Sequence, residues 1–305
     1  DLGYMHVALL ADGLATGIDA LHESIALLIE LGDKRGEIRA EAMLGQAYLS
    51  LGDARGARGE LARAQRLAEE VGDQLEACAA TILLAQAALE QAEFQGAIDG
   101  ARSGAGEAMR LGSTSQLGPA IMVESAAHAW GGRYAEALAL VQVAFDRAAE
   151  VPHALMEVRM LQTRAEVLGL LGRYPEAIAA CETLLALMVE TGNLEPQGRL
   201  CAIWGTLLTR AGDKGEAKAY LDQAVGVAEA GGSRGTLLRA RLGEARLALL
   251  EERWEAAGAA CEAALPLARS LGARHLEAEA LGLRGEWALA TQAAGAAADF
   301  ALMSE

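Results

Sequence analysis

The sequence predicts an all-α protein, folded as a superhelix of stacked antiparallel helix pairs. Hydrophobic residues make up 52% of the 305 residues but aromatic residues only 4%, so the apolar mass is mainly Ala and Leu. This composition favours close packing of helices over a β-sandwich, which needs β-branched and aromatic residues, and it excludes a disordered chain. Two periodicities in the sequence, one of 20 residues and one of 40, predict the same fold.

Helix-ending residues recur every 20 residues. Glycine just past a helix end accepts the left-handed conformation that closes the last turn. It stands at Gly32, Gly52, Gly72, Gly112, Gly132, Gly172, Gly192, Gly212, Gly232 and Gly272. The remaining places hold Ala92-Glu93, Pro152-His153, Glu252-Arg253 and Gln292-Ala293. The stretches of about 16 to 18 residues between these breaks are rich in good helix formers, so we expect about 16 helices and no strands.

Columns of small residues recur every 40 residues, which makes a helix pair the repeating unit. A column in the second helix of each pair reads Ala57, Ala97, Ala137, Ala177, Ala217, Ala257 and Ala297. A column in the first helix reads Gly45, Ala85, Ser125, Ala165, Gly205, Ala245 and Gly285. We expect the two helices of a pair to approach most closely at these columns, because larger side chains would separate them. A third column is partly aromatic and is expected to wedge between the helices: Ala54, Phe94, Tyr134, Tyr174, Lys214, Trp254 and Ala294.

The periodicity indicates a single helical-repeat domain over residues 1–305 rather than two globular domains. About seven and a half repeats fill the chain. Their expected bounds are 1–33, 34–73, 74–113, 114–153, 154–193, 194–233, 234–273 and 274–305.

These residues resemble the tetratricopeptide repeat. Leu44-Gly45, Tyr48, Ala57, Leu61 and Ala64 fall at the spacing of its signature, and the segments 132–137 and 172–177 resemble its turn and second helix. The period of 40 instead of 34 is similar to that of sensor arrays in large bacterial regulators, such as the maltose-regulon activator type, multidomain ATPases and arrays fused to nucleotide cyclases. A HEAT-type solenoid has a similar period, but the alanine column favours the tetratricopeptide repeat. The resemblance implies a right-handed superhelix that binds partners on its concave face.

Charge and cysteine content restrict the class of partner and the compartment. With 26 basic and 42 acidic residues, the net charge of −16 disfavours binding to nucleic acid or to anionic membranes. No segment approaches the length of a membrane span. The four cysteines show no Cys-x-x-Cys pair, which favours a cytoplasmic location. Because the chain starts at Asp1 without an initiator Met or a signal-like segment, we interpret it as a piece of a longer protein.

Motifs for catalysis are weak, so we expect no enzyme activity, cofactor or metal. Gly231-Gly232-Ser233-Arg234-Gly235 satisfies the Gly-x-Ser-x-Gly pattern, but it falls on a turn between two helices instead of the required strand-to-helix turn. The five histidines show no ligand spacing. Cys181 and Cys261 share a column with Leu61 and Leu221, which indicates small core residues.

Candidate binding residues lie on the predicted inner wall of the superhelix. One column reads Arg39, Ala79, Pro119, Arg159, Arg199, Arg239 and Glu279, so three consecutive repeats carry arginine. Such a ladder would attract an acidic segment or an anionic small ligand. The alternative is that each arginine is solvated or paired with a nearby glutamate. Further inner-wall candidates are Gln162, Glu166, Thr206, Arg210 and Arg246, with Gln46, Gln86, Glu90, Met122 and Trp130 towards the N-terminus. Trp130 is either an exposed anchor for a peptide or a core residue.

The leading hypothesis for function is therefore a non-enzymatic binding module. It would be the sensor or scaffold region of a larger bacterial cytosolic regulator, acting in signalling or transcription regulation, and it would bind a peptide, protein or small effector on its concave face. The alternative hypothesis is a free-standing assembly adaptor, or an array that self-associates through its uncapped ends.

Overall fold

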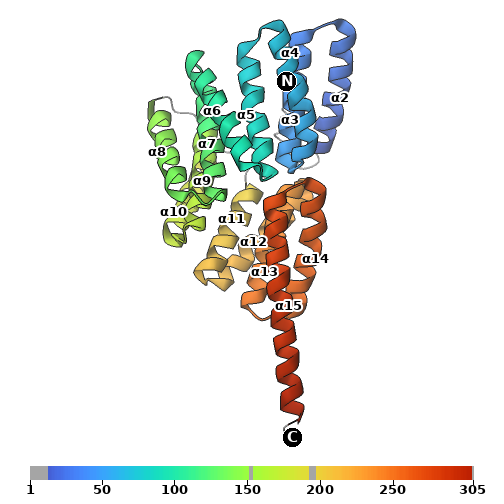
Figure 1. Ribbon diagram of the computed structural model, residues 1–305, viewed down its shortest axis with the longest axis vertical. Helices are drawn as coiled ribbons and strands as arrows, with labels where there is room; N and C mark the ends of the chain where they lie inside the picture. The colour runs from blue at the N-terminus through green and yellow to red at the C-terminus, as the bar shows by residue number, and fades with distance from the viewer. Residues whose placement is uncertain (1–12, 151–153, 192–196, 304–305) are drawn as a thin grey trace.

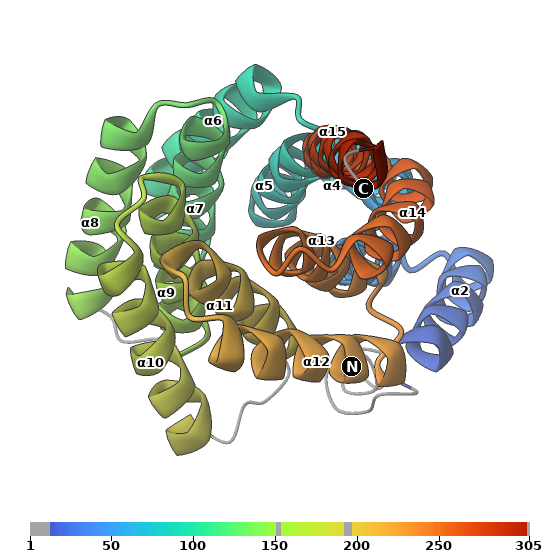
Figure 2. The same cartoon turned by 90° about the horizontal axis from the view of Figure 1, so that it is seen from below.

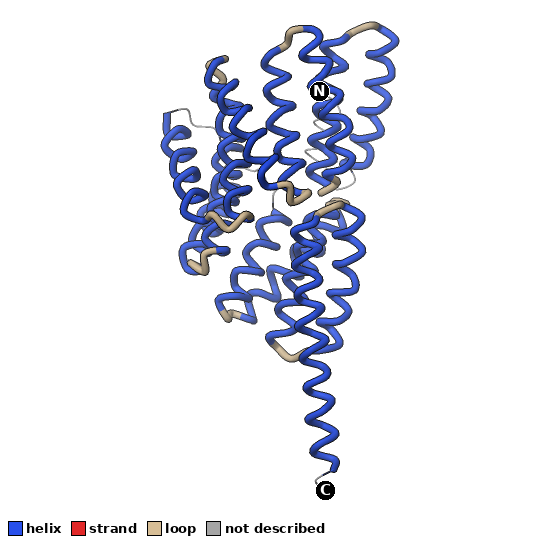
Figure 3. The backbone as a smooth tube through the Cα atoms, in the orientation of Figure 1, coloured by secondary structure: helices blue, strands red, loops and turns tan. Residues whose placement is uncertain are grey.

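The computed structural model describes residues 13–150, 154–191 and 197–303, and it confirms the all-α superhelical fold. Fourteen helices follow one another in these residues, with no strand among them (Figures 1 and 3). Their bounds are α2 Gly13–Leu31, α3 Lys34–Leu51, α4 Ala54–Val71, α5 Gln74–Glu90, α6 Phe94–Arg110, α7 Thr114–Trp130, α8 Tyr134–Glu150, α9 Ala154–Leu170, α10 Tyr174–Thr191, α11 Gln197–Ala211, α12 Lys214–Ala230, α13 Arg234–Leu250, α14 Trp254–Leu271 and α15 Arg274–Met303.

The helices form two layers around a common axis. Each helix packs antiparallel against the next. First helices of neighbouring pairs also contact one another, as α5 does with α7, α7 with α9, α11 with α13 and α13 with α15. Seen along the axis, α5, α7, α9, α11 and α13 line the inside, and α6, α8, α10 and α12 lie outside them (Figure 2). The first helices therefore form the inner wall that the sequence predicted.

The turns confirm the 20-residue periodicity wherever they are described. At Gly52 the backbone is left-handed (φ 84°), and the following Asp53 N–H donates to the Tyr48 carbonyl at 2.8 Å. The Asp53 side chain then accepts from the Gly56 N–H at 2.9 Å, which begins the next helix. Ala92 and Glu252 take the same left-handed conformation (φ 60° and 56°), so these two places turn without glycine. The places near 152 and 192 lie outside the described residues.

The two small columns meet as predicted. Every described member of the alanine column from Ala57 to Ala257 is fully buried, and Ala297 lies outside the described side chains. Ser125 Oγ donates to the Ala137 carbonyl at 2.8 Å, so these columns touch directly. A Cβ at Gly205 would lie 3.1 Å from the Ala217 carbonyl oxygen. Phe94, Tyr134 and Tyr174 of the third column pack half-buried against the core, as expected.

The helix break expected at Gln292 is wrong. Helix α15 continues through this place and has 30 residues. Gln292 and Ala293 offer neither a glycine for the left-handed turn nor a side chain that caps the next helix, and the Ala-rich sequence around them favours continued helix. In consequence no described second helix covers α15: a Cβ at Gly285 would meet no atom within 4 Å.

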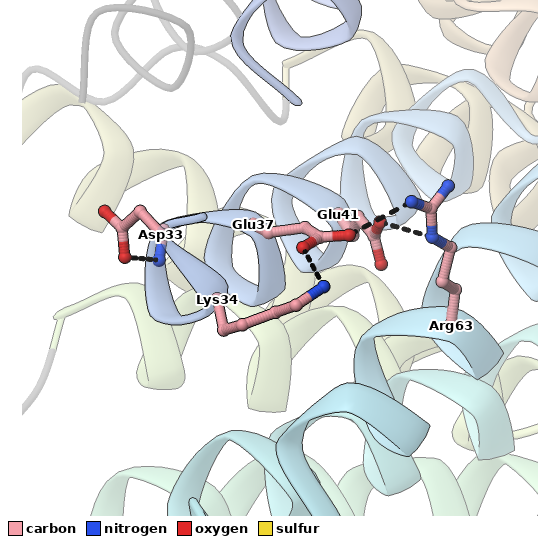
Figure 4. A network of polar contacts seen from close by, with 6 residues as sticks. Asp33, Lys34, Glu37, Glu41 and Arg63 are labelled. Carbon is pink, nitrogen blue, oxygen red and sulfur yellow. Dashed lines mark hydrogen bonds and ion pairs between the residues drawn. The ribbon is translucent and has the colours of Figure 1, made fainter. Parts of the chain in front are cut away.

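A buried polar network joins α3 to α4 (Figure 4). Glu37 accepts from Lys34 Nζ at 2.9 Å and from Arg63 Nη2 at 3.0 Å. Arg63 Nε lies 2.7 Å from Oε1 of Glu41, whose side chain is fully buried. Burial raises the pKa of Glu41 to about 7, against the attraction of Arg63. Glu37 is also buried, but its hydrogen bonds to Lys34 and Arg63 outweigh desolvation and lower its pKa.

Candidate binding site on the inner wall

Ion pairs join neighbouring first helices along the inner wall. Arg199 Nη2 on α11 lies 3.2 Å from Glu166 Oε1 on α9, and Arg246 Nη2 on α13 lies 3.0 Å from Glu279 Oε1 on α15. Both pairs link residues 33 positions apart, so they repeat one contact in two places of the array, two repeats apart and with the two charges exchanged. Arg210 also approaches Glu279, at 3.7 Å. Arg199 and Arg246 are therefore each held by a glutamate of the adjacent repeat.

Arg239, the third arginine of the predicted ladder, pairs with a residue far away in the sequence. Its Nη2 atom lies 3.4 Å from Oε2 of Glu90 on α5, 149 residues earlier. Only 14% of the Arg239 side chain and 16% of the Glu90 side chain are exposed. Burial alone would raise the pKa of Glu90, but the charges of Arg239, His275 and Arg199 lower it below its ordinary value. Glu90 is thus held ionised inside the superhelix.

Trp130 packs inside the molecule, as the core alternative predicted. Its ring lies 4.7 Å from the ring of His275, centroid to centroid, at an interplanar angle of 59°. It also contacts the apolar cluster of Ala88, Leu89 and Ala97 and the cluster of α13 to α15. The interpretation of Trp130 as an exposed peptide anchor is therefore wrong.

Three buried nitrogen atoms on or beside the inner wall have no hydrogen-bond partner among the described residues. They are Gln162 Nε2, Arg246 Nε and His275 Nδ1. A buried donor without a partner costs free energy that water or a ligand can recover. Thr206 differs, because its hydroxyl donates to the Ala202 carbonyl of its own helix at 2.8 Å. Gln86 and Arg159 are half-buried on α5 and α9.

The protein-family models contain no match to this sequence, and neither do the curated proteins. Solved structures do resemble the chain. A Rap protein complexed with competence and sporulation factor matches with a TM-score of 0.64 and 14% identity, over 90% of this chain and 81% of that chain. The apo form of the quorum sensor NprR from B. thuringiensis gives 0.55 and 14%, over 92% and 82%. A signal transduction ATPase with numerous domains and a tetratricopeptide repeat sensor, from Pyrococcus horikoshii, gives 0.56 and 13%, over 90% of this chain but only 42% of that one.

The fold is that of a tetratricopeptide-repeat array. The resemblance inferred from the Leu-Gly signature and the alanine column is thereby confirmed at the level of the fold. In this array the Gly-x-Ser-x-Gly pattern lies on the turn between α12 and α13. Ser233 directly precedes the first residue of α13. Its Oγ atom lies 3.0 Å from Thr236 Oγ1 and 3.4 Å from the Ser50 carbonyl oxygen, so the turn interpretation is confirmed.

The array brings together charged residues that the sequence had assigned to separate repeats of the inner wall. The inner wall gathers four arginines and three glutamates: Arg199, Arg210, Arg239, Arg246, Glu90, Glu166 and Glu279. His275 was missed as a member, because no column marks it and its neighbours come from distant repeats. All four cysteines are buried and free, which agrees with the core positions expected for Cys181 and Cys261.

Two further searches of the described residues gave no site. No group of three or more His, Cys, Asp or Glu side chains is arranged there to hold a metal ion. None of the described helices combines the length and the apolar character needed to cross a lipid bilayer.

Proposed function

We propose that this chain is a non-enzymatic binding module whose inner wall takes a peptide. In the cell it would be the sensor or scaffold region of a larger cytoplasmic regulator. The ligand would lie along α9, α11 and α13, where the repeats present the same positions at regular spacing. An acidic segment would have to compete with Glu90, Glu166 and Glu279 for the arginines, so a ligand that offers neutral acceptors as well as charge fits this wall better.

The observation that carries the proposal is the set of buried nitrogens without partners. Gln162 Nε2 and Arg246 Nε are donors from first helices two repeats apart. The backbone of an extended peptide carries carbonyl acceptors at regular intervals and can serve several such donors at once. A wall that pairs its charges but leaves an amide donor and a guanidinium Nε–H open suits a polar, largely uncharged chain.

The structural neighbours favour the same class of function. One was crystallised with competence and sporulation factor, one is a quorum sensor, and one carries a tetratricopeptide repeat sensor in a multidomain ATPase. These descriptions belong to those proteins. They support a signalling role for this array. The array spans less than half of the ATPase chain.

Selection from a random peptide display library, followed by calorimetry on the full chain, tests the proposal. Gln162→Leu removes an open donor without breaking an ion pair, and it should weaken the selected peptides about tenfold, as expected for one buried hydrogen bond. Gln142→Leu is the matched control, because Gln142 lies exposed on α8 and bonds to Asp146. If no peptide is selected, or if both variants bind it equally well, the inner wall is not the site.

A second candidate function is self-association, which the uncovered face of α15 favours. Leu289 is 71% exposed, although Leu89, Ala129 and Thr209 at the same place in other repeats are buried. Sedimentation of the full chain at several concentrations would detect a dimer, and Leu289→Glu should dissociate it. Leu31→Glu on α2, also at an exposed leucine, is the control. A strict monomer at all concentrations excludes this function.

A further inference from the structure

The superhelix contacts itself after about one turn. In a solenoid each repeat normally touches only its neighbours, so its shape follows from the neighbouring interfaces alone. Here residues about four repeats apart meet: Glu90 with Arg239 and Trp130 with His275. In Figure 1, helices α13 to α15 lie directly beneath α3 to α5. We call this set of contacts between successive turns the seam.

The outer part of the seam is a tip-to-tip contact of two helix ends. A Cβ at Gly52, after α3, would lie 2.7 Å from the Cα of Gly235 in the first turn of α13. Ser233 Oγ lies 3.4 Å from the Ser50 carbonyl oxygen, 183 residues away. Two glycines at the point of contact allow the backbones to approach this closely. The contact is narrow, because it joins turns and not helix faces.

The inner part of the seam consists of the ion pair of Glu90 with Arg239 and of Trp130, which lies against the His275 ring and packs on the apolar cluster of α13 to α15. Both residues of the ion pair stand on the inner wall itself. Neighbouring repeats, by contrast, are joined by continuous apolar clusters, such as the one that includes Leu184, Leu200 and Leu221. Extended hydrophobic burial therefore holds neighbouring repeats together, whereas one tryptophan and a few polar contacts hold the seam.

We infer that the seam is a latch: the pairs Glu90–Arg239 and Trp130–His275 hold the superhelix closed, and their release lets α13 to α15 move away from α3 to α7. The free energy to open it is that of the Trp130 packing and a few polar contacts, because the continuous apolar clusters that join neighbouring repeats stay intact. Opening the seam widens the space inside the superhelix and so gives a ligand access to the inner wall. This role of the latch rests on the proposed function. The opening itself takes place with or without a ligand.

Acid is expected to open the latch through His275. Burial lowers the pKa of His275, and Arg239 on α13 lowers it further, whereas Glu90 on α5, Glu279 on α15 and Glu166 on α9 raise it. The imidazole that stacks on Trp130 is therefore neutral at pH 7. Once protonated, it is better solvated outside the seam, and leaving the seam removes the ring pair.

A cross-linking experiment on the full chain tests the latch. Ser50→Cys and Ser233→Cys place two thiols across the seam, and a short bis-maleimide joins them only while it is closed. The four native cysteines are buried and do not compete. The rate of cross-linking should fall about tenfold or more in Arg239→Gln. It should fall equally in the double variant Glu90→Gln/Arg239→Gln, in which neither charge of the pair remains. Lys218→Gln is the control, because it removes an exposed ion pair with Asp222 within α12.

Small-angle scattering at pH 7.5 and 5.5 gives a second measurement, without added cysteines. The radius of gyration of the unaltered chain should rise at pH 5.5, and His275→Phe, which keeps a ring against Trp130, should abolish the rise. His22→Phe, at an exposed histidine, should retain it. Unchanged cross-linking in both Arg239 variants, with helicity intact by circular dichroism, overturns the latch. If the Arg239 variants slow the cross-link but no peptide is selected, the latch is supported and the proposed function is overturned.

Discussion

Replacing Glu41 by glutamine should stabilise the protein increasingly as the pH rises from 4.5 to about 7, and fully above that. Glu41 is fully buried between α3 and α4, and its pKa is raised from 4.5 to about 7, first of all by desolvation. A group whose pKa is raised by folding binds its proton more tightly in the folded state. Its contribution to stability is therefore complete below pH 4.5 and is lost as the pH rises through 7.

The magnitude follows from the two pKa values. A pKa of about 7 in place of 4.5 corresponds, at about 1.4 kcal/mol for each pKa unit, to a loss of about 3 kcal/mol by pH 8.5. Glutamine keeps an oxygen acceptor near Arg63 and cannot ionise, so Glu41→Gln avoids this loss. We therefore expect the unfolding free energy of the variant, minus that of the parent, to be up to about 3 kcal/mol larger at pH 8.5 than at pH 4.

Urea unfolding of the parent and the variant at pH 4, 7 and 8.5 measures this difference. Glu37→Gln is a matched control from the same network. Lys34 and Arg63 lower the pKa of Glu37 in spite of its burial, so this variant should lose stability, relative to the parent, as the pH rises through the range below 4.5. If the free-energy difference for Glu41→Gln does not change with pH, or changes in the opposite direction, the assignment of a raised pKa is refuted.

Three further predictions concern the packing, the thiols and the seam. Ala177→Leu should destabilise by about 1–3 kcal/mol through overpacking where the helices of a pair meet, whereas exposed Ala179→Leu should leave the melting temperature unchanged. Burial raises the pKa of Cys181 to about 12 and of Cys201 to about 11, so neither should react with a thiol reagent at pH 8 until denaturant is added; rapid labelling of the native protein would contradict this. Because folding lowers the pKa of His275, stability should fall as the pH drops below about 6.5, and His275→Phe should reduce that fall in urea titrations.

Most of the fold could be predicted because it depends on short-range patterns. A left-handed glycine ends a helix through its own backbone, and Asp53 begins the next one through a contact three residues away. Ser125 and Ala137 meet because two helices joined by a short turn place residues 12 positions apart in contact. The one wrong turn, at Gln292, lies where neither signal is present, and there the helix continues.

The inner-wall side chains could be predicted in part. The structure places Arg199, Arg239 and Arg246, which the sequence assigned to the inner wall, in ion pairs with glutamates. Glu166, the partner of Arg199, and Glu279, the partner of Arg246, could be read from an adjacent repeat, because adjacent first helices keep a constant offset of 33 residues. The role of these side chains in binding a partner stays a prediction.

The sequence by itself determined the helices, their turns, the small columns that pair them and the residues that face the axis. Only the tertiary structure decided that Glu90 meets Arg239, that Trp130 stacks on His275, and that Ser233 reaches Ser50. The physical reason is that the pitch of a superhelix is the sum of small rotations at every interface between repeats. Each rotation depends on detailed packing, and residues a full turn apart meet only if those rotations add up to close the turn.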